Sequence, residues 1–306
     1  MILFNRSLSL SAEAQRKRAF LLGLLPALVV LAVITIAPAI YLFVTSLTPL
    51  DLTRPEVTAN DFSRPWTNYA ELYTDKRFHN SVWVQVKLSV VTVSLQLLMG
   101  LAVALLLNAP SRFLEAVRTA FLIPMVLPPI VVSIIWKVLY IPDVSPMHRL
   151  LELIGFPIES LITNPKWALW AIAIADTWEW FPFTMLILLA ALQMIPDEPL
   201  EAARIDGAGA WQMFRYIILP LLRPVIVVAA LFRLIDSIKA FPLIYVLTDG
   251  GPGLVTEVTN YYAFIEAFNF SYWGYAGAIA VLMVAGVFFL SWIINRMATR
   301  SALQET

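Results

Sequence analysis

Long apolar stretches alternate with short charged segments along the whole chain. A bilayer core about 30 Å thick is crossed by roughly 20 apolar residues in a helix, and a backbone in lipid must satisfy its hydrogen bonds within the segment. This pattern predicts an all-α membrane protein with six transmembrane helices. The predicted spans cover residues 19–47, 82–108, 119–140, 167–195, 225–247 and 275–295.

Basic residues indicate how these spans are oriented. Short cytoplasmic loops retain Lys and Arg, and the basic residues flanking the spans are more numerous on the side that holds both termini. We therefore expect an N-in, C-in topology, with a cytoplasmic segment at 1–18, a membrane domain at 19–298 and a cytoplasmic tail at 299–306. The apolar run after Arg18 is far longer than the core of a secretory signal, which indicates a retained signal anchor.

Prolines occur inside several of the predicted spans. Proline removes a helix hydrogen bond, but a helix bundle tolerates it where neighbours or water compensate. We therefore interpret Pro124, Pro128 and Pro129 in the third span, and Pro242 in the fifth, as kinks within transmembrane helices.

The composition agrees with a membrane protein and excludes several functions. Of the 306 residues, 60% are apolar and 14% are charged, whereas soluble domains carry about 25% charged residues. Lys and Arg together number 21, as do Asp and Glu, so no basic excess supports nucleic-acid binding. The chain has no Cys, and its two His, His79 and His148, lie far apart. We therefore expect no catalytic residue of the thiolate or His type and no metal site.

The predicted cytoplasmic loop at 196–224 favours short helices. Asp197 and Glu201 suit the positive end of a helix dipole, and Gly207 suits a helix end. A second short helix is expected at 210–218. Composition alone is compatible with an amphipathic connector that has no partner, so the exact residues of the loop decide its interpretation.

The loop carries a spaced motif whose residues are Glu201, Ala202, Ala203, Gly207, Ile217, Leu219 and Pro220. This motif resembles the "EAA loop" of permease subunits in bacterial ATP-binding-cassette (ABC) importers, and it lies between the predicted fourth and fifth spans, where that loop belongs. The resemblance extends over nearly the whole chain. It implies the type I ABC importer permease fold with a cytoplasmic coupling loop.

A second motif follows the fifth predicted span. The segment Thr248-Asp249-Gly250-Gly251-Pro252 looks like the Thr-x-Gly-Gly-Pro turn of one permease type in carbohydrate importers of the maltose kind. Many members of that family have a third glycine where this chain has Asp249. The turn remains feasible, because Asp tolerates left-handed backbone geometry better than most residues. We expect Gly250, Gly251 and Pro252 to form this turn on the external side.

The resemblance also implies partners. In that family the EAA loop docks into an ATPase subunit and transmits ATP-driven closure, a role that falls here on Glu201, Ala202, Ala203, Asp206 and Gly207. The expected partners are a second permease subunit that forms a heterodimer, a dimer of ABC ATPases, an external or periplasmic solute-binding protein and the lipid bilayer. The chain has no phosphate-binding loop of the Gly-x4-Gly-Lys type. ATP and Mg are therefore expected on the ATPase subunits, with no cofactor and no enzyme activity in this chain.

Charged residues inside the predicted spans need a partner or a polar cavity, because a charge at the centre of a membrane helix costs ~2.5–3.5 kcal/mol. One interpretation is an ion-pair network, for instance of Asp176 or Glu179 with Arg233, that holds two spans together. The other is a polar cavity for a hydroxyl-rich solute, which the resemblance favours. The residues expected to contact substrate are Asp176, Glu179, Trp180, Phe183, Arg233, Asp236, Ser237 and Ala240.

These features predict a permease subunit of an ATP-driven importer in the bacterial cell (inner) membrane, which moves a carbohydrate, a polyol or a sugar derivative by alternating access. The alternative is an ion- or proton-coupled secondary transporter, which would explain the intramembrane charges without an ATPase. An intramembrane enzyme is a more distant third interpretation, since the paired carboxylates have no supporting catalytic pattern.

Overall fold

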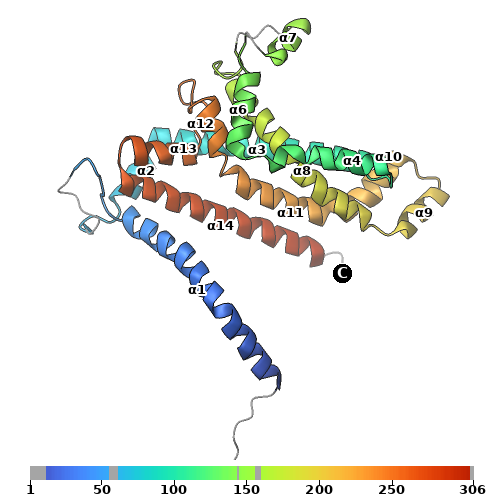
Figure 1. Cartoon of the computed structure of the whole chain (residues 1–306), viewed down its shortest axis with the longest axis horizontal. Helices are drawn as coiled ribbons and strands as arrows, with labels where there is room; N and C mark the ends of the chain where they lie inside the picture. Colours follow the sequence, from blue (N-terminus) through green and yellow to red (C-terminus); the bar gives the residue numbers. More distant parts are fainter. Residues whose placement is uncertain (1–11, 55–60, 143–144, 156–159, 304–306) are drawn as a thin grey trace, which may run out of the picture.

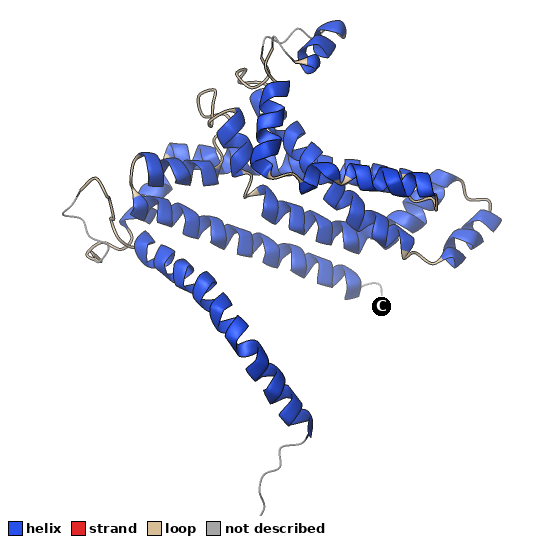
Figure 2. Cartoon of the chain, viewed as in Figure 1, coloured by secondary structure: helices blue, strands red, loops and turns tan. Residues whose placement is uncertain are grey.

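The computed structural model describes residues 12–54, 61–142, 145–155 and 160–303, and the regular elements in these ranges are all helical (Figure 2). Four long helices run side by side through the body of the molecule (Figure 1). They are α3 (Lys76–Leu106), α8 (Ala168–Gln193), α11 (Leu219–Ser237) and α14 (Trp273–Leu303).

Shorter helices cover the two ends and one side of this body. Near one end lie α9 and α10, and near the opposite end lie α2 and α13, while α6 and α12 pack on each other along the side (Figure 1). The shorter elements are α2 (Thr67–Thr74), α4 (Arg112–Phe121), α5 (Ile123–Val126), α6 (Pro129–Leu139), α7 (Pro146–Leu153), α9 (Asp197–Ile205), α10 (Ala210–Met213), η1 (Phe214–Ile218), α12 (Phe241–Leu247), α13 (Thr259–Phe264) and η2 (Ile265–Asn269).

The N-terminal helix α1 (Ala12–Ser46) diverges from the body (Figure 1). It meets α14 near its C-terminal end, where Gly277 lies against the carbonyl of Leu42 and the backbone of Ser46. Most apolar side chains along the rest of α1 are exposed, with Phe20 and Ile34 at 68% and 67%. A helix that is apolar on all faces and exposed to this degree is stable only in an apolar surrounding such as lipid.

Five helices are long and apolar enough to cross a membrane, and they confirm a multi-spanning helical protein. They are Arg16–Ser46, Lys76–Leu106, Ala168–Gln193, Ala210–Ser237 and Trp273–Ile294. Four of them coincide with the first, second, fourth and sixth spans expected from the sequence. The first 11 residues of the expected cytoplasmic segment and residues 304–306 of the expected tail lie outside the described residues.

The expected third span at 119–140 is wrong as a continuous helix, because its prolines divide it. The chain there forms α4, α5 and α6, and only Pro129–Leu139 remains as an apolar helix, too short to count as a span. Pro124 lies in the first turn of α5, and Pro128 is the residue that precedes α6. Proline is favoured at a helix start, where its missing N–H costs nothing, so each proline begins a new helix instead of kinking an old one.

The expected fifth span at 225–247 is also displaced. Its helix begins much earlier, at Ala210, and continues without interruption to Ser237, so the second loop helix merges with the span. The helix ends there because Pro242 would clash with the carbonyl four residues before it if the helix continued. Instead Pro242 lies in the first turn of α12, and Ala240 (ψ 45°) forms the bend between the two helices.

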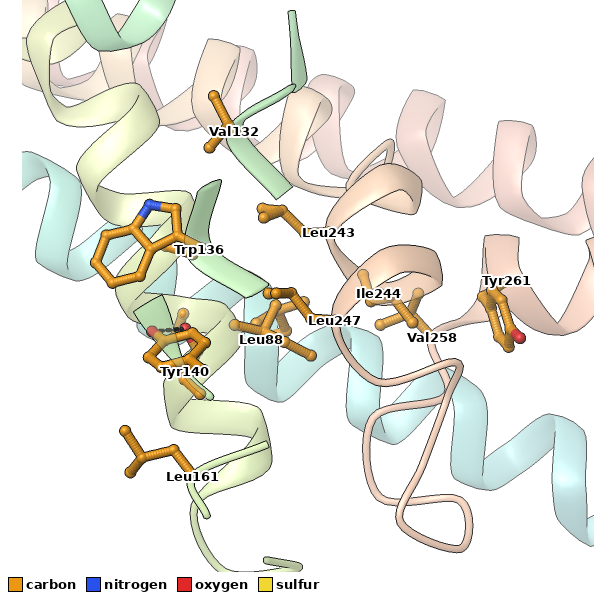
Figure 3. Packing of buried hydrophobic residues seen from close by; sticks show 14 of the residues in the cluster. Leu88, Val132, Trp136, Tyr140, Leu161, Leu243, Ile244, Leu247, Val258 and Tyr261 are labelled. Carbon is orange, nitrogen blue, oxygen red and sulfur yellow. Dashed lines mark hydrogen bonds between the residues drawn. The ribbon is translucent and has the colours of Figure 1, made fainter. Parts of the chain in front are cut away.

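A buried apolar cluster fixes α6 and α12 against the first two turns of α8. Figure 3 shows Trp136 of α6 and Tyr140, the residue after α6, beside Leu243, Ile244 and Leu247 of α12. The Tyr140 hydroxyl donates a 2.7 Å hydrogen bond to the carbonyl of Ala171 in α8. These contacts hold α6 and α12 in place. Pro129 of α6 and Leu243 of α12 therefore lie opposite the polar residues of α8 and α11.

Candidate functional site

A stripe of polar residues runs along α3 inside the bundle. Gln85, Ser89, Thr92 and Gln96 follow the four- and three-residue steps of one helix face, and all four are buried. The Ser89 hydroxyl accepts a hydrogen bond from the side-chain amide of Gln85 (3.1 Å) and another from the Ser237 hydroxyl of α11 (2.7 Å). The stripe therefore joins α3 to α11 through polar contacts within an apolar span.

Gln96 connects three helices. Its amide nitrogen donates to the Asp176 carboxylate of α8 at 2.7 Å, and its amide oxygen accepts from Arg233 Nε of α11 at 2.8 Å. The backbone carbonyl of Gln96 accepts a further bond, of 2.7 Å, from the Thr184 hydroxyl of α8. Gln96 has no exposed surface. It lies between Asp176 and Arg233, for which one interpretation of the sequence expected a direct ion pair.

Arg233 is 1% exposed, and its guanidinium group contacts other side chains of the bundle. Besides Gln96, it contacts the Asp236 carboxylate at 3.5 Å and lies over the Trp180 ring, 4.6 Å from the ring centre. Within the described ranges no ion pair joins Arg233 to Asp176 or Glu179. The ion-pair interpretation paired Arg233 with Asp176 or Glu179, whereas its contacts are with Gln96, Asp236 and the Trp180 ring.

A cavity of about 270 Å³ opens where α6, α8, α11 and α12 meet. Its polar wall is formed by Asp176, Glu179, Trp180, Asp236 and Lys239. Asp236 also accepts a 3.3 Å contact from the ammonium of Lys239, whose side chain is 72% exposed. The cavity thus presents three carboxylates and one cation that is already paired.

Glu179 differs from the other acids of the cavity. It is 1% exposed, and neither of its carboxylate oxygens has a hydrogen-bond partner. A buried carboxylate without donors is costly, so Glu179 is the least satisfied acid beside the cavity.

The structure brings together five of the eight residues that were expected to contact substrate. Asp176, Glu179, Trp180, Asp236 and Ala240 line the cavity. The other three lie elsewhere: Arg233 is engaged behind the wall, Ser237 bonds to the α3 stripe, and Phe183 packs edge-on against Phe232.

Sequence reasoning missed the α3 stripe, Gln96 above all, and the cavity residue Leu243. It also left Lys239, Pro129 and Pro242 out of the residues expected to contact substrate, although they line the cavity. The signal for the stripe was present: polar residues at 85, 89, 92 and 96 keep helical spacing within an apolar run. Uncharged side chains do not stand out when a span is searched for charges, which is why these were overlooked.

The expected glycine turn at 248–253 has a defined geometry. Asp249 has φ 52° and Gly250 has φ 80°, so the left-handed backbone expected to be tolerated at Asp249 is present. A Cβ on Gly250 would lie 2.8 Å from a ring carbon of Tyr261, whose hydroxyl donates to the Asp249 carboxylate. Thr256 closes the turn by donating a 2.7 Å bond to the carbonyl of Gly251.

The same end of the molecule holds a second polar network, around Asp75. Its carboxylate accepts hydrogen bonds from the hydroxyls of Tyr262 (2.6 Å) and Tyr275 (2.5 Å). Burial by itself would raise the pKa of Asp75, but these bonds and those from the backbone outweigh it and bring the pKa below its ordinary value of 3.8. Next to it, Arg77 makes a bidentate ion pair with Glu257, at 2.9 and 2.7 Å.

The expected helix at the start of the 196–224 loop is present as α9. Asp197 and Glu198 lie in its first turn, and it ends in a Schellman arrangement. The N–H of Gly207 donates to the carbonyl of Arg204, and the N–H of Ala208 donates to that of Ala203. Gly207 has φ 82°, which a residue without a Cβ adopts freely.

The surface of α9 and of the following turn is exposed. Glu201, Ala202 and Asp206 face outward, and Ile205 is 86% exposed. Trp211 of α10 is 71% exposed. An apolar and an aromatic side chain presented in this way at one end of the bundle are typical of a surface that another protein covers.

Comparisons with known proteins agree with this arrangement. Residues 96–301 match the family described as "Binding-protein-dependent transport system inner membrane component". The trehalose/maltose transport system permease protein MalF of Thermococcus litoralis is 39% identical over 70% of this chain and 72% of its own length. The trehalose transport system permease protein SugA of Mycobacterium tuberculosis is 33% identical over 94% of this chain and 90% of its own.

Two further comparisons add a relative and a solved structure. The sulfoquinovosyl glycerol transport system permease protein SmoG of Agrobacterium fabrum is 35% identical over 86% of this chain and 84% of its own. A bacterial ABC transporter involved in the import of the acidic polysaccharide alginate has a chain that superposes with a TM-score of 0.79 at 21% identity, over 94% of this chain and 97% of that one. This likeness shows the type I ABC permease fold. The chain therefore belongs to the family of binding-protein-dependent transport system inner membrane components, and it is a subunit for transport and not an enzyme.

Proposed function

We propose that the chain is one permease subunit of an ATP-driven importer of a carbohydrate, polyol or sugar derivative, which works by alternating access. The observation that carries the proposal is the family match over residues 96–301, because this range contains both the polar cavity and α9. The permease relatives named for trehalose, maltose and sulfoquinovosyl glycerol support a sugar as the class of substrate. The matched family depends on binding proteins, so an ion-coupled carrier has no comparable support.

The coupling surface is α9 with the turn that follows it, and its residues are Glu201, Ala202, Ala203, Asp206 and Gly207. Two features support this role. The Schellman end makes α9 a short rigid element, and its exposed Ile205 offers an apolar anchor for a partner. ATP and Mg belong to the ATPase subunits in this proposal, and this chain binds neither.

The proposed assembly contains a second permease, an ATPase dimer and an external solute-binding protein in the bacterial inner membrane. Both termini of this chain are cytoplasmic, as the distribution of basic residues favours. The α9 end of the bundle then faces the ATPase, and the opposite end, with the glycine turn of Gly250, Gly251 and Pro252, faces the binding protein (Figure 1). The ranges 19–298 for the membrane domain and 196–224 for the coupling segment belong to this proposal.

The first experiment is to tag the chain, extract it from its own membranes in mild detergent and identify the proteins that co-purify by mass spectrometry. A second permease and an ABC ATPase are expected. A Gly207→Val variant, which places a β-branched residue at φ 82°, is expected to lose the ATPase and keep the second permease.

The matched control is Gly209→Val, since Gly209 has φ −73° and accepts a side chain without strain. Uptake in vesicles gives the second readout, and it is expected to depend on ATP. Recovery of the chain without any ATPase, together with uptake that survives ATP depletion and collapses with the proton gradient, would refute the proposal in favour of a secondary transporter.

A further inference from the structure

A second pocket, of about 380 Å³, lies where α3 and α8 begin, and none of the described residues that line it lines the polar cavity. One wall is a stripe of α3 that runs from Asn80 to Val91 at helical spacing. The other wall is the start of α8, with Lys166 just before the helix and Trp170 in its first turn. Val255, which follows the glycine turn, also lines the pocket. The pocket therefore lies between two membrane helices, at the end of the bundle where both begin.

The two charged residues that line this pocket are lysines. Lys87 and Lys166 are both exposed, and in the part of the chain that the structure describes neither ammonium has an ion-pair partner. The Lys87 ammonium lies 5.0 Å from the centre of the Trp83 ring. No side chain caps the described start of α8, whose first N–H groups carry a partial positive charge. The pocket thus has a positive potential with no carboxylate to balance it, which favours an anion.

The pocket lies at the depth of lipid headgroups. The 26 residues of α8 rise about 39 Å, at about 1.5 Å per residue, whereas the hydrocarbon core of a bilayer is about 30 Å thick, so the first turn of α8 reaches the membrane surface. Trp83, Trp167 and Trp170 lie on or next to the walls, each between 37% and 58% exposed, and tryptophan is enriched at this depth. Val91 of α3 and Ala173 of α8, about one turn further along each helix, give the pocket an apolar floor.

We propose that this pocket binds one phospholipid with an anionic phosphate headgroup, from the leaflet at this end of the bundle. The phosphate accepts hydrogen bonds from the ammonium groups of Lys87 and Lys166, and an acyl chain covers Val91 and Ala173. Pockets between membrane helices that carry Lys or Arg suit anionic lipid headgroups. A free phosphate would pair with the lysines but leave the apolar floor uncovered, and a lipid without net charge would cover the floor but leave the lysines unbalanced. An anionic phospholipid does both, and it is distinct from the transported solute.

The test is a lipid titration of the full chain, purified in a neutral detergent with the partners that it retains. Two phospholipids of equal chain length are compared: phosphatidylglycerol, which carries a net negative charge, and phosphatidylcholine, which carries none. Native mass spectrometry counts the lipids bound at each concentration, and the phosphatidylglycerol titration is repeated with inorganic phosphate present. We expect the wild type to bind a first phosphatidylglycerol more tightly than phosphatidylcholine and to keep it in the presence of phosphate.

The variant combines Lys87→Gln with Lys166→Gln, which removes both charges. We expect it to weaken binding of the first phosphatidylglycerol about 25-fold, because each Lys near anionic lipid contributes about fivefold in affinity. The matched control combines Lys76→Gln with Lys137→Gln, two exposed lysines outside the pocket, and it is expected to bind like the wild type. A third variant, with Lys87→Arg and Lys166→Arg, keeps both charges and is expected to keep the preference for phosphatidylglycerol.

Four results would overturn the proposal. They are equal binding of the two lipids by the wild type, displacement of phosphatidylglycerol by inorganic phosphate, equal weakening in the glutamine variant and its control, and no bound phosphatidylglycerol because a helix of the second permease covers this face. Size-exclusion chromatography monitors the assembly of each variant. If the glutamine variant does not assemble, the preference of the wild type and of the arginine variant decides the question.

Discussion

The packing of α3 on α8 depends on one glycine, and Gly100→Ala tests it. A Cβ on Gly100 would lie 2.8 Å from both the backbone nitrogen of Met185 and the Cβ of Thr184, and still nearer to the Thr184 hydroxyl. Contacts with backbone atoms at this distance require the helices to move apart. One turn earlier, the Thr184 hydroxyl donates its 2.7 Å bond to the carbonyl of Gln96, so the displacement would also strain the polar centre.

The expected cost follows from two opposing effects. Inserting a methyl group into a packed core costs typically ~1–3 kcal/mol, and weakening the hydrogen bond from Thr184 adds about 1 kcal/mol. Against this, Ala stabilises a helix interior by about 1 kcal/mol relative to Gly. We therefore expect Gly100→Ala to lower the free energy of unfolding by ~1–3 kcal/mol.

The control is Gly23→Ala in α1. No atom lies within 4 Å of its Cβ position, so only the gain in helix propensity applies. The assay is thermal unfolding of each purified variant in the same detergent, with the midpoint followed by loss of monodisperse protein. A Gly100→Ala variant as stable as Gly23→Ala would refute the close approach of α3 and α8 at this turn.

Two further predictions concern polar contacts. Gln96→Leu removes the 2.7 Å hydrogen bond that the Asp176 carboxylate accepts and leaves one guanidinium N–H of Arg233 without its partner. We expect it to cost about 3 kcal/mol in the same unfolding assay. The exposed Gln193→Leu is the control, and equal midpoints would contradict the role of Gln96 as a connector. The hydrogen bonds to Asp75 lower its pKa, so they stabilise the fold above about pH 4, and this contribution is lost as the pH falls below that value. Between about pH 3 and 7 the unfolding midpoint is therefore expected to fall more steeply for the wild type than for Asp75→Asn, and parallel pH profiles would count against the network.

Hydropathy predicts a membrane helix correctly where an apolar run is not broken by a proline. The helices α1, α3, α8 and α14 agree with the expected spans because each is an apolar run with no proline at a point that breaks it. The third span fails because hydropathy counts apolar residues and not backbone hydrogen bonds. A proline inside an apolar run can lie within a continuous helix, as Pro182 does in α8. It can also begin a new helix, as Pro129 does at the start of α6. Only the surrounding packing distinguishes these cases.

The site could be predicted in part because charge inside a membrane is conspicuous. Asp176, Glu179 and Asp236 were found from the cost of burying a charge, and the cavity contains all three. The partner of each charge could not be predicted, because it depends on which third helix packs against both α8 and α11. That helix is α3, whose Gln96 carries no charge and separates Arg233 from Asp176.

The sequence left two interpretations open for the intramembrane charges, structural pairing and a polar cavity. The residues concerned differ in which of these their contacts favour. Arg233 contacts Gln96, Asp236 and the Trp180 ring, and it is 1% exposed, so it acts within the protein. Its contacts hold Asp236 and, through Gln96, Asp176. Glu179 is equally buried but has no such partner. A protein that paired all of its buried charges would have no capacity left for a ligand, and one that paired none would not be stable. The two residues therefore differ in kind: Arg233 is a buried base held by protein contacts, and Glu179 is a buried acid without a hydrogen-bond partner.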